Sequence, residues 1–165
     1  MSLEFSALRI GQGYDVHKLV EGRKLIIGGV DIPHTLGLLG HSDADVLARA
    51  VADARLGAIR GGDIGKLFPD TDPEWEGADS MKLLAAVANK VREEGFQIID
   101  VDSVIAAQKP KMAPHRQQMR ENLAAAMGIA VDNVGVKATT TEGLGFEGEQ
   151  KGISATAVAL LARCS

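Results

Sequence analysis

Apolar residues recur with two different periods along this chain, and their alternation constrains the fold more than any other feature. Strand-like patterns cover residues 8–16, 24–32, 98–107 and 134–138, whereas helix-like patterns cover residues 43–59, 79–94 and 114–127. The apolar stretch 153–162 fits either period. Because strands and helices are intermixed, with hairpin-like pairs among them, we expect a two-layer α+β domain.

Length and composition favour one domain spanning residues 1–165, with residues 1–7 disordered or left over from cloning. The net charge of −4 argues against a nucleic-acid partner, because a phosphate backbone needs a basic surface. Cys164 is the only cysteine, so no intrachain disulfide can form. No apolar run approaches the roughly 18 residues that span a bilayer. We therefore expect a cytoplasmic protein without a membrane partner.

Asp15 and His17 are separated by one residue in the first strand-like segment. Side chains at positions i and i+2 of a strand point to the same face, so the carboxylate and the imidazole converge. Both groups are good ligands for Zn²⁺ or a similar ion. A simple hydrogen-bonded Asp–His couple is the alternative interpretation.

A second polar cluster, His41-Ser-Asp-Ala-Asp45, opens the helix expected at 43–59. Ser42 or Asp43 is a suitable N-cap, and the N–H groups at a helix start favour a phosphate. Capping alone gives His41 no role. Further along, Asp45, Arg49 and Asp53 are spaced four residues apart, so a ladder of salt bridges on one helix face is the structural alternative.

Three loops carry further ligand-binding chemistry. Residues 61–79 form a long glycine- and acid-rich loop, in which Asp70 or Asp72 can bind ribose hydroxyls; an acidic surface loop is the alternative, although it would expose Leu67 and Phe68. The proline-punctuated segment 107–113 suits a nucleobase or is an ordinary connection. Segment 137–146 combines threonines for phosphate oxygens with Glu142 for Mg²⁺, or is a Thr-rich strand end.

Taken together, these segments resemble the 2-C-methyl-D-erythritol 2,4-cyclodiphosphate synthase family over about residues 8–163. The resemblance rests on Gly13-Tyr-Asp-Val-His17, Gly40-His-Ser-Asp-Ala-Asp45, Gly62-Asp-Ile-Gly65, Phe68-Pro-Asp-Thr-Asp-Pro73, Pro110-Lys-Met112 and Val136-Lys-Ala-Thr-Thr-Thr-Glu142. It implies a mixed sheet packed by helices on one face, in a homotrimer with active sites at subunit interfaces. It also implies a step of non-mevalonate isoprenoid biosynthesis. There, metal-assisted intramolecular phosphoryl transfer converts 4-diphosphocytidyl-2-C-methyl-D-erythritol 2-phosphate to the cyclic diphosphate and CMP.

The resemblance also implies roles for individual residues. Asp15 and His17 would hold a zinc-like ion, Glu142 would hold Mg²⁺ or Mn²⁺, and His41 and Thr140 would stabilise the transition state. Positions matching substrate contacts are Ser42, Asp63, Gly65, Phe68, Pro69, Asp70, Thr71, Asp72, Ala107, Gln108, Lys109, Pro110, Lys111, Met112, Ala113, Thr139, Thr141, Phe146 and Glu149. Among them, residues 107–113 and Thr139 match a cytidine pocket shared with a neighbouring subunit.

Two positions depart from the family pattern. Arg49 stands where the family has a third metal-ligand His, and a protonated guanidinium has no lone pair for a metal. It either points to Asp15, where the ion would sit, or turns outward. Glu149 replaces a residue that is often basic, with Lys151 two positions on. We expect weaker metal binding and reduced activity; the alternatives are an impaired relative that binds cytidine nucleotide or isoprenoid diphosphate, and a metal-dependent phosphohydrolase.

Overall fold

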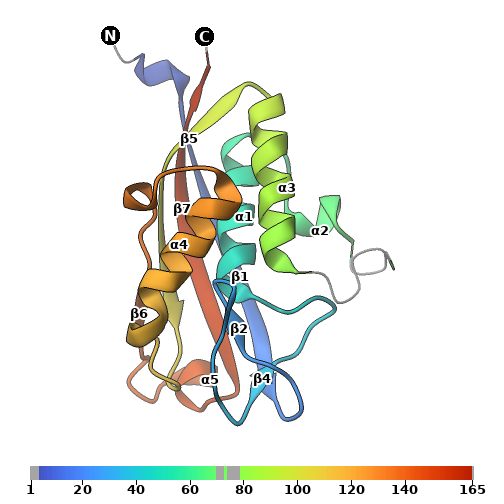
Figure 1. Ribbon diagram of the computed structural model, residues 1–165, viewed down its shortest axis with the longest axis vertical. Helices are drawn as coiled ribbons and strands as arrows, with labels where there is room; N and C mark the ends of the chain where they lie inside the picture. Colours follow the sequence, from blue (N-terminus) through green and yellow to red (C-terminus); the bar gives the residue numbers. More distant parts are fainter. Residues whose placement is uncertain (1–3, 70–72, 74–78, 165) are drawn as a thin grey trace.

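The computed structural model describes residues 4–69, 73 and 79–164, and its centre is a five-stranded sheet (Figure 1). The strands are β1 (Leu8–Val20), β4 (Gly37–Leu38), β5 (Phe96–Ala106), β6 (Lys137–Thr139) and β7 (Gly152–Arg163). Their order is β4-β1-β7-β5-β6, and every pair is antiparallel except the parallel pair β5–β6. The predicted α+β fold with a mixed sheet is therefore confirmed.

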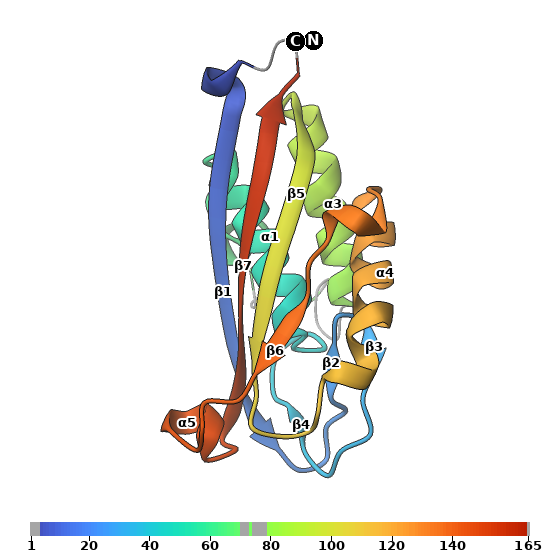
Figure 2. The same cartoon turned by 90° about the vertical axis from the view of Figure 1, so that its left-hand side faces the viewer.

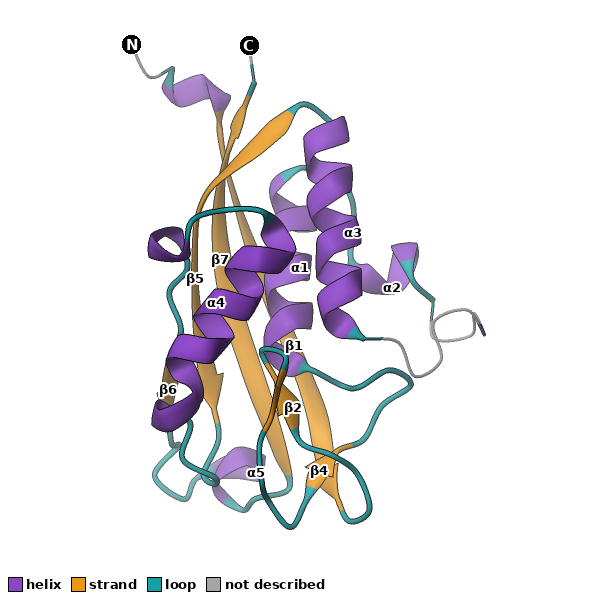
Figure 3. Ribbon diagram, viewed as in Figure 1, coloured by secondary structure: helices purple, strands orange, loops and turns teal. Residues whose placement is uncertain are grey.

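Helices cover one face of this sheet, as Figure 2 and Figure 3 show. The covering helices are α1 (Val46–Ala58), α3 (Ser80–Glu93) and α4 (Arg116–Met127). The other helical elements are η1 (Phe5–Ala7), α2 (Ile64–Leu67), η3 (Ala113–His115), η4 (Val131–Asn133) and α5 (Gly145–Gly148). Asp79 caps α3 through the Met81 amide, and Gly128 ends α4 in the left-handed conformation with φ of 68°. The predicted ends of these two helices are thus confirmed to within two residues.

Glycines on β1 let α1 lie directly on the strand. A Cβ atom added at Gly11 or Gly13 would overlap the backbone of α1 at Ala54 or Ala50. Because this face of β1 also carries Asp15 and His17, the close approach places the first turns of α1 beside both side chains.

Four expectations about strands are revised or resolved. Residues 24–32 are not one strand, because Gly28 and Gly29 both have positive φ and turn the chain between β2 (Ile26–Ile27) and β3 (Val30–Asp31), which pair outside the main sheet. The ambiguous segment 153–162 is the interior strand β7. A register shift in β5 between Ile98 and Asp100 takes Ile99 out of the expected alternation, whereas Val101, Ser103 and Ile105 are buried on one face as expected. The strand predicted at 134–138 begins only at Lys137.

The other face of the sheet carries exposed apolar side chains. Ile10, Tyr14 and Val16 alternate with the residues of β1 that face α1, and their exposed fractions are 67%, 52% and 41%. Val158 of β7, paired with Gln12, adds to this surface at 42%. We call these four residues the open sheet face. No helix among the described residues is long and apolar enough to cross a membrane.

Candidate functional site

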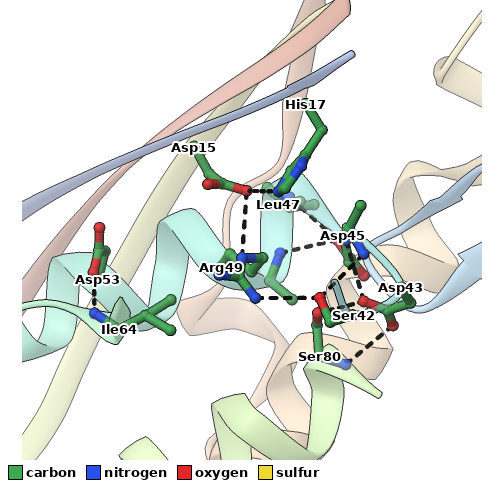
Figure 4. Close-up of polar contacts among 12 residues, drawn as sticks. Asp15, His17, Ser42, Asp43, Asp45, Leu47, Arg49, Asp53, Ile64 and Ser80 are labelled. Carbon is green, nitrogen blue, oxygen red and sulfur yellow. Dashed lines mark hydrogen bonds and ion pairs between the residues drawn. The ribbon is translucent and has the colours of Figure 1, made fainter. Parts of the chain in front are cut away.

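Asp15 and His17 point together toward the start of α1 (Figure 4). His17 Nδ1 lies 2.8 Å from the Leu39 carbonyl oxygen, so an Nδ1–H group donates there and, in the neutral ring, Nε2 carries the lone pair. Nε2 lies 3.1 Å from Asp15 Oδ2. Burial lowers the pKa of His17, but the adjacent Asp15 carboxylate and the Leu39 carbonyl outweigh it and raise this pKa above its ordinary value. Two electron-rich atoms this close require a proton or another cation between or beside them.

Arg49 supplies that positive charge from the first turn of α1. Its Nε lies 3.6 Å from Asp15 Oδ2, and its Nη1 donates to Ser42 Oγ at 3.2 Å. The side chain thus takes the inward of the two expected orientations. Asp15, His17 and Arg49 together are called the β1–α1 site below.

The expected ladder of Asp45, Arg49 and Asp53 is wrong, because each carboxylate has backbone partners instead. Asp45 accepts hydrogen bonds from the amides of Gly28, Gly29, Leu47 and Ala48. Asp53 accepts a 2.8 Å bond from the Ile64 amide and thereby anchors α2. Burial raises the pKa of Asp53.

The β1–α1 site does not fit a zinc ion held by three protein ligands. Asp15 Oδ2, His17 Nε2 and Arg49 Nε are buried and lack hydrogen-bond partners, so polar atoms do converge on an unsaturated position. One of the three is a guanidinium nitrogen, which cannot coordinate a metal. Among the described residues, no group of three His, Cys, Asp or Glu side chains is placed to hold a metal.

The cap of α1 differs from the one expected. Asp45, rather than Ser42 or Asp43, accepts the amide hydrogen bonds of the first turn. Asp43 instead accepts bonds from the Ser80 amide at 3.0 Å and from the Ser80 hydroxyl, which ties the His41–Ser42 segment to α3.

Ser42 itself is buried, and its carbonyl accepts a 2.8 Å bond from Arg23 Nη2. Sequence patterns could not reveal this role of Arg23, because Arg23 and Ser42 are 19 residues apart. His41 is half-buried next to Ser42.

The described part of the loop at 61–79 is more ordered than expected. Asp63 caps α2 through the Lys66 amide at 2.9 Å, and Gly65 lies within this short helix. Leu67 and Phe68 pack against the hydrophobic core, which explains these apolar residues without a ligand. Pro69 is exposed, and Asp70, Thr71 and Asp72 lie outside the described residues.

A separate cavity of about 250 Å³ lies between the end of β5 and β6, and we call it the β5–β6 cavity. The structure brings most of segment 107–113 together with Thr139 and Thr140 here. The lining residues are Ala107, Gln108, Pro110, Lys111, Met112, Ala113, Arg116, Lys137, Ala138, Thr139 and Thr140. Lys109 is not among them, whereas Arg116 and Lys137 are cations that the sequence analysis did not select.

Glu142 lies on the turn between β6 and α5 and is exposed. Its positive φ of 55° and the bond from its amide to Thr140 Oγ1, at 3.3 Å, shape the turn. The Gly143 amide donates to Gln108 Oε1 at 3.2 Å, so the turn is attached to the β5–β6 cavity. Thr141 donates its hydroxyl to the Leu144 carbonyl at 2.6 Å and also stays within the turn.

Phe146 and Lys151 line a different hollow, next to Val16 and His17. Glu149 forms an exposed 2.9 Å ion pair with Lys151. Lys151 therefore offsets the charge of Glu149 locally. Its expected role in replacing a basic residue at position 149 stays a prediction.

The β1–α1 site and the β5–β6 cavity lie at different strands of one chain. β7 and β5 separate β1 from β6, and neighbouring strands lie about 4.8 Å apart, so the two regions are separated by roughly 14 Å across the sheet. A ligand contacting both must span this distance or bind between two copies of the chain.

Comparisons with known proteins find relatives over nearly the whole chain. The YgbB family model matches residues 8–162. The 2-C-methyl-D-erythritol 2,4-cyclodiphosphate synthase of Trichlorobacter lovleyi is 65% identical, over 93% of this chain and 98% of its own, and that of Clostridioides difficile is 58% identical, over 93% and 96%.

Solved structures show the same fold. A cyclodiphosphate synthase structure with bound CDP covers 93% of this chain and 99% of its own, with a TM-score of 0.85 and 40% identity. The bifunctional IspDF of Campylobacter jejuni reaches a TM-score of 0.91 at 44% identity and covers 94% of this chain. This chain spans 42% of the length of that bifunctional protein.

Proposed function

Because this chain belongs to the YgbB family, among whose members are close relatives named 2-C-methyl-D-erythritol 2,4-cyclodiphosphate synthase, we propose that it catalyses that reaction. It converts 4-diphosphocytidyl-2-C-methyl-D-erythritol 2-phosphate to the cyclic diphosphate and CMP, in non-mevalonate isoprenoid biosynthesis in the cytoplasm. The observation that carries the proposal is the 65% identity over 93% of the chain.

The reaction needs no side-chain nucleophile, because the substrate itself supplies the attacking phosphate. An oxygen of the substrate's 2-phosphate forms a bond to the β-phosphorus, while the bond from that phosphorus to the bridging oxygen breaks. CMP leaves with the electron pair of the broken bond. Phosphoryl transfer of this kind depends mainly on positioning the phosphates and on stabilising their charge.

The β5–β6 cavity is suited to the cytidine end of the substrate. It combines backbone groups of segment 107–113 with the hydroxyls of Thr139 and Thr140 and with two cations, Arg116 and Lys137. Two related structures are described as containing CDP, which supports a cytidine nucleotide as the kind of ligand. His41, Ser42 and the 63–69 segment would then contact the sugar and phosphate groups.

Glu142 fits a Mg²⁺ or Mn²⁺ ion, because a single exposed carboxylate can hold such an ion together with substrate phosphates and water. When bound, this ion would neutralise diphosphate charge. The attachment of the Glu142 turn to Gln108 would hold the carboxylate next to the cytidine end.

For the β1–α1 site, we propose weaker zinc binding and lower activity than in a relative with three ligands. Asp15 and His17 provide two donors, whereas a catalytic zinc normally has three protein ligands and an open position. Metal analysis and CMP release, compared between the parent protein and Arg49→His, test this expectation. Equal zinc content and equal rates in both proteins would contradict it.

A homotrimer with active sites between subunits is part of the proposal. The open sheet face carries large apolar side chains that a neighbouring subunit can bury. The separation of the β1–α1 site from the β5–β6 cavity also favours a ligand-binding region completed by a second copy. Light scattering at several protein concentrations should give three times the 17.4 kDa chain mass.

Chromatographic detection of nucleotide products tests the activity itself. The purified protein with substrate and Mg²⁺ should release CMP, and Glu142→Gln should slow this release. Release of inorganic phosphate without CMP would indicate a phosphohydrolase. CDP binding without turnover at any metal concentration would indicate the impaired relative.

A further inference from the structure

The orientation of Arg49 differs from what a salt-bridged surface arginine would show. Its Nε faces Asp15 Oδ2 at 3.6 Å, within an ion pair whose side chains are only 15% and 22% exposed. Nε and Oδ2 are both buried without hydrogen-bond partners, and His17 Nε2 beside them is in the same condition. Figure 4 shows these groups converging between β1 and α1. An acceptor arriving from outside the chain can complete this arrangement.

Neighbouring residues hold the guanidinium in this position. Ser42 Oγ accepts from Nη1, Ser42 is buried, and Arg23 holds the Ser42 carbonyl. Among the residues that the structure describes, the hydrogen bonds and ion pairs of Arg49 engage Nε and Nη1. Because a guanidinium carries five N–H donors, further donors remain for an incoming acceptor.

A guanidinium and a divalent ion compete for the same position. Arg49 is always protonated, so it repels a second cation at Asp15 and His17. The same charge attracts phosphate oxygens, which a planar guanidinium can bind through two parallel hydrogen bonds. Arg49 thus places a positive charge at the position where a metal ion would bind in a protein with three ligand side chains.

We propose that the Arg49 guanidinium itself binds the β-phosphate of the cytidine diphosphate group and replaces the zinc-like ion expected at Asp15 and His17. This inference rests on the proposed function, because it takes the diphosphate as the ligand. Asp15 and Ser42 are then positioning residues that orient the guanidinium. His17 borders the same phosphate-binding position from β1.

A comparison of the affinities for CDP and CMP separates this role from general charge effects, because only CDP carries the β-phosphate. Calorimetric titrations would use the whole protein with excess Mg²⁺ and the zinc-selective chelator TPEN. The parent protein should bind CDP equally well with and without TPEN. Arg49→Gln should weaken CDP binding about 10- to 100-fold, the range expected for a lost charged hydrogen bond, and leave CMP binding unchanged.

Two further variants serve as controls. Arg60→Gln removes one exposed arginine at the end of α1 and should change neither affinity. Arg49→His should gain about one zinc ion per chain, and its CDP affinity should become sensitive to TPEN. Thermal unfolding of each variant shows whether it is folded.

The outcomes distinguish the inference from the proposed function. An unchanged ratio of CDP to CMP affinity in Arg49→Gln would overturn the inference and leave the proposed function standing. A parent protein that contains zinc and loses affinity for CDP when TPEN is added would also overturn the inference and leave the proposed function standing. Parent protein that binds neither nucleotide would overturn both.

Discussion

Replacing Gly13 by alanine should separate the two elements that build the β1–α1 site. A Cβ atom at position 13 would lie 2.6 Å from the Ala54 nitrogen and still closer to the Ala50 carbonyl oxygen. Ordinary contact begins near 3.4 Å, so α1 must retreat by about 0.8 Å or more. Overpacking of this kind costs about 1–3 kcal/mol, which lowers Tm by about 2–12 °C for a chain of this length.

The same displacement should reduce activity, because Arg49 precedes Ala50 on α1 whereas Asp15 follows Gly13 on β1. A misplacement near 1 Å can cost about 100-fold in rate. Differential scanning fluorimetry and CMP release measure the two effects on the same sample.

Gly57→Ala is the matched control, since an added Cβ there would lie 3.6 Å from its nearest neighbour, the Gln12 oxygen. It should keep activity and gain up to about 1 kcal/mol in stability from helix propensity. If the two variants behave alike, close packing of α1 on β1 does not position the site.

Three further substitutions test other parts of the structure. Arg55 is fully buried, its guanidinium nitrogens lack hydrogen-bond partners, and burial lowers its pKa to about 9. Arg55→Leu should therefore raise the free energy of unfolding by about 1–4 kcal/mol. A lower Tm in this variant would refute the expectation. Burial raises the pKa of Asp45 from 3.8 to about 6, so its contribution to stability is present below pH 3.8 and is lost as pH rises through about 6. Urea unfolding between pH 4 and 7 should show this fall in the parent protein and a smaller fall in Asp45→Asn; identical pH profiles would contradict the assignment. Asp43→Ala removes the bonds to Ser80 and should cost about 1–2 kcal/mol and reduce kcat, whereas unchanged values would show that this link does not hold the His41–Ser42 segment.

Local sequence signals predicted those features whose causes are local. The period-two spacing of Asp15 and His17 placed both side chains on one face of β1, and Gly128 marked the end of α4. The helix at 43–59 was also predictable from its apolar spacing, although its first turn begins later, at Val46.

Features that depend on distant segments were not predictable in this way. The cap of α1 is Asp45 because the Gly28 and Gly29 amides, 17 and 16 residues earlier, also reach its carboxylate. Arg49 leaves the expected helical ladder because Asp15 approaches from the neighbouring strand. Likewise, Lys137 joins the β5–β6 cavity through the parallel pairing of β5 and β6.

³¹P NMR of the complete reaction tests the central claim most directly. Protein treated to remove zinc and supplied with Mg²⁺ alone should convert the substrate to equimolar CMP and 2-C-methyl-D-erythritol 2,4-cyclodiphosphate, whose two phosphorus atoms are coupled in one ring. Inorganic phosphate as the product would contradict the proposed reaction. Formation of the cyclic product only after zinc is added would contradict the role assigned to Arg49.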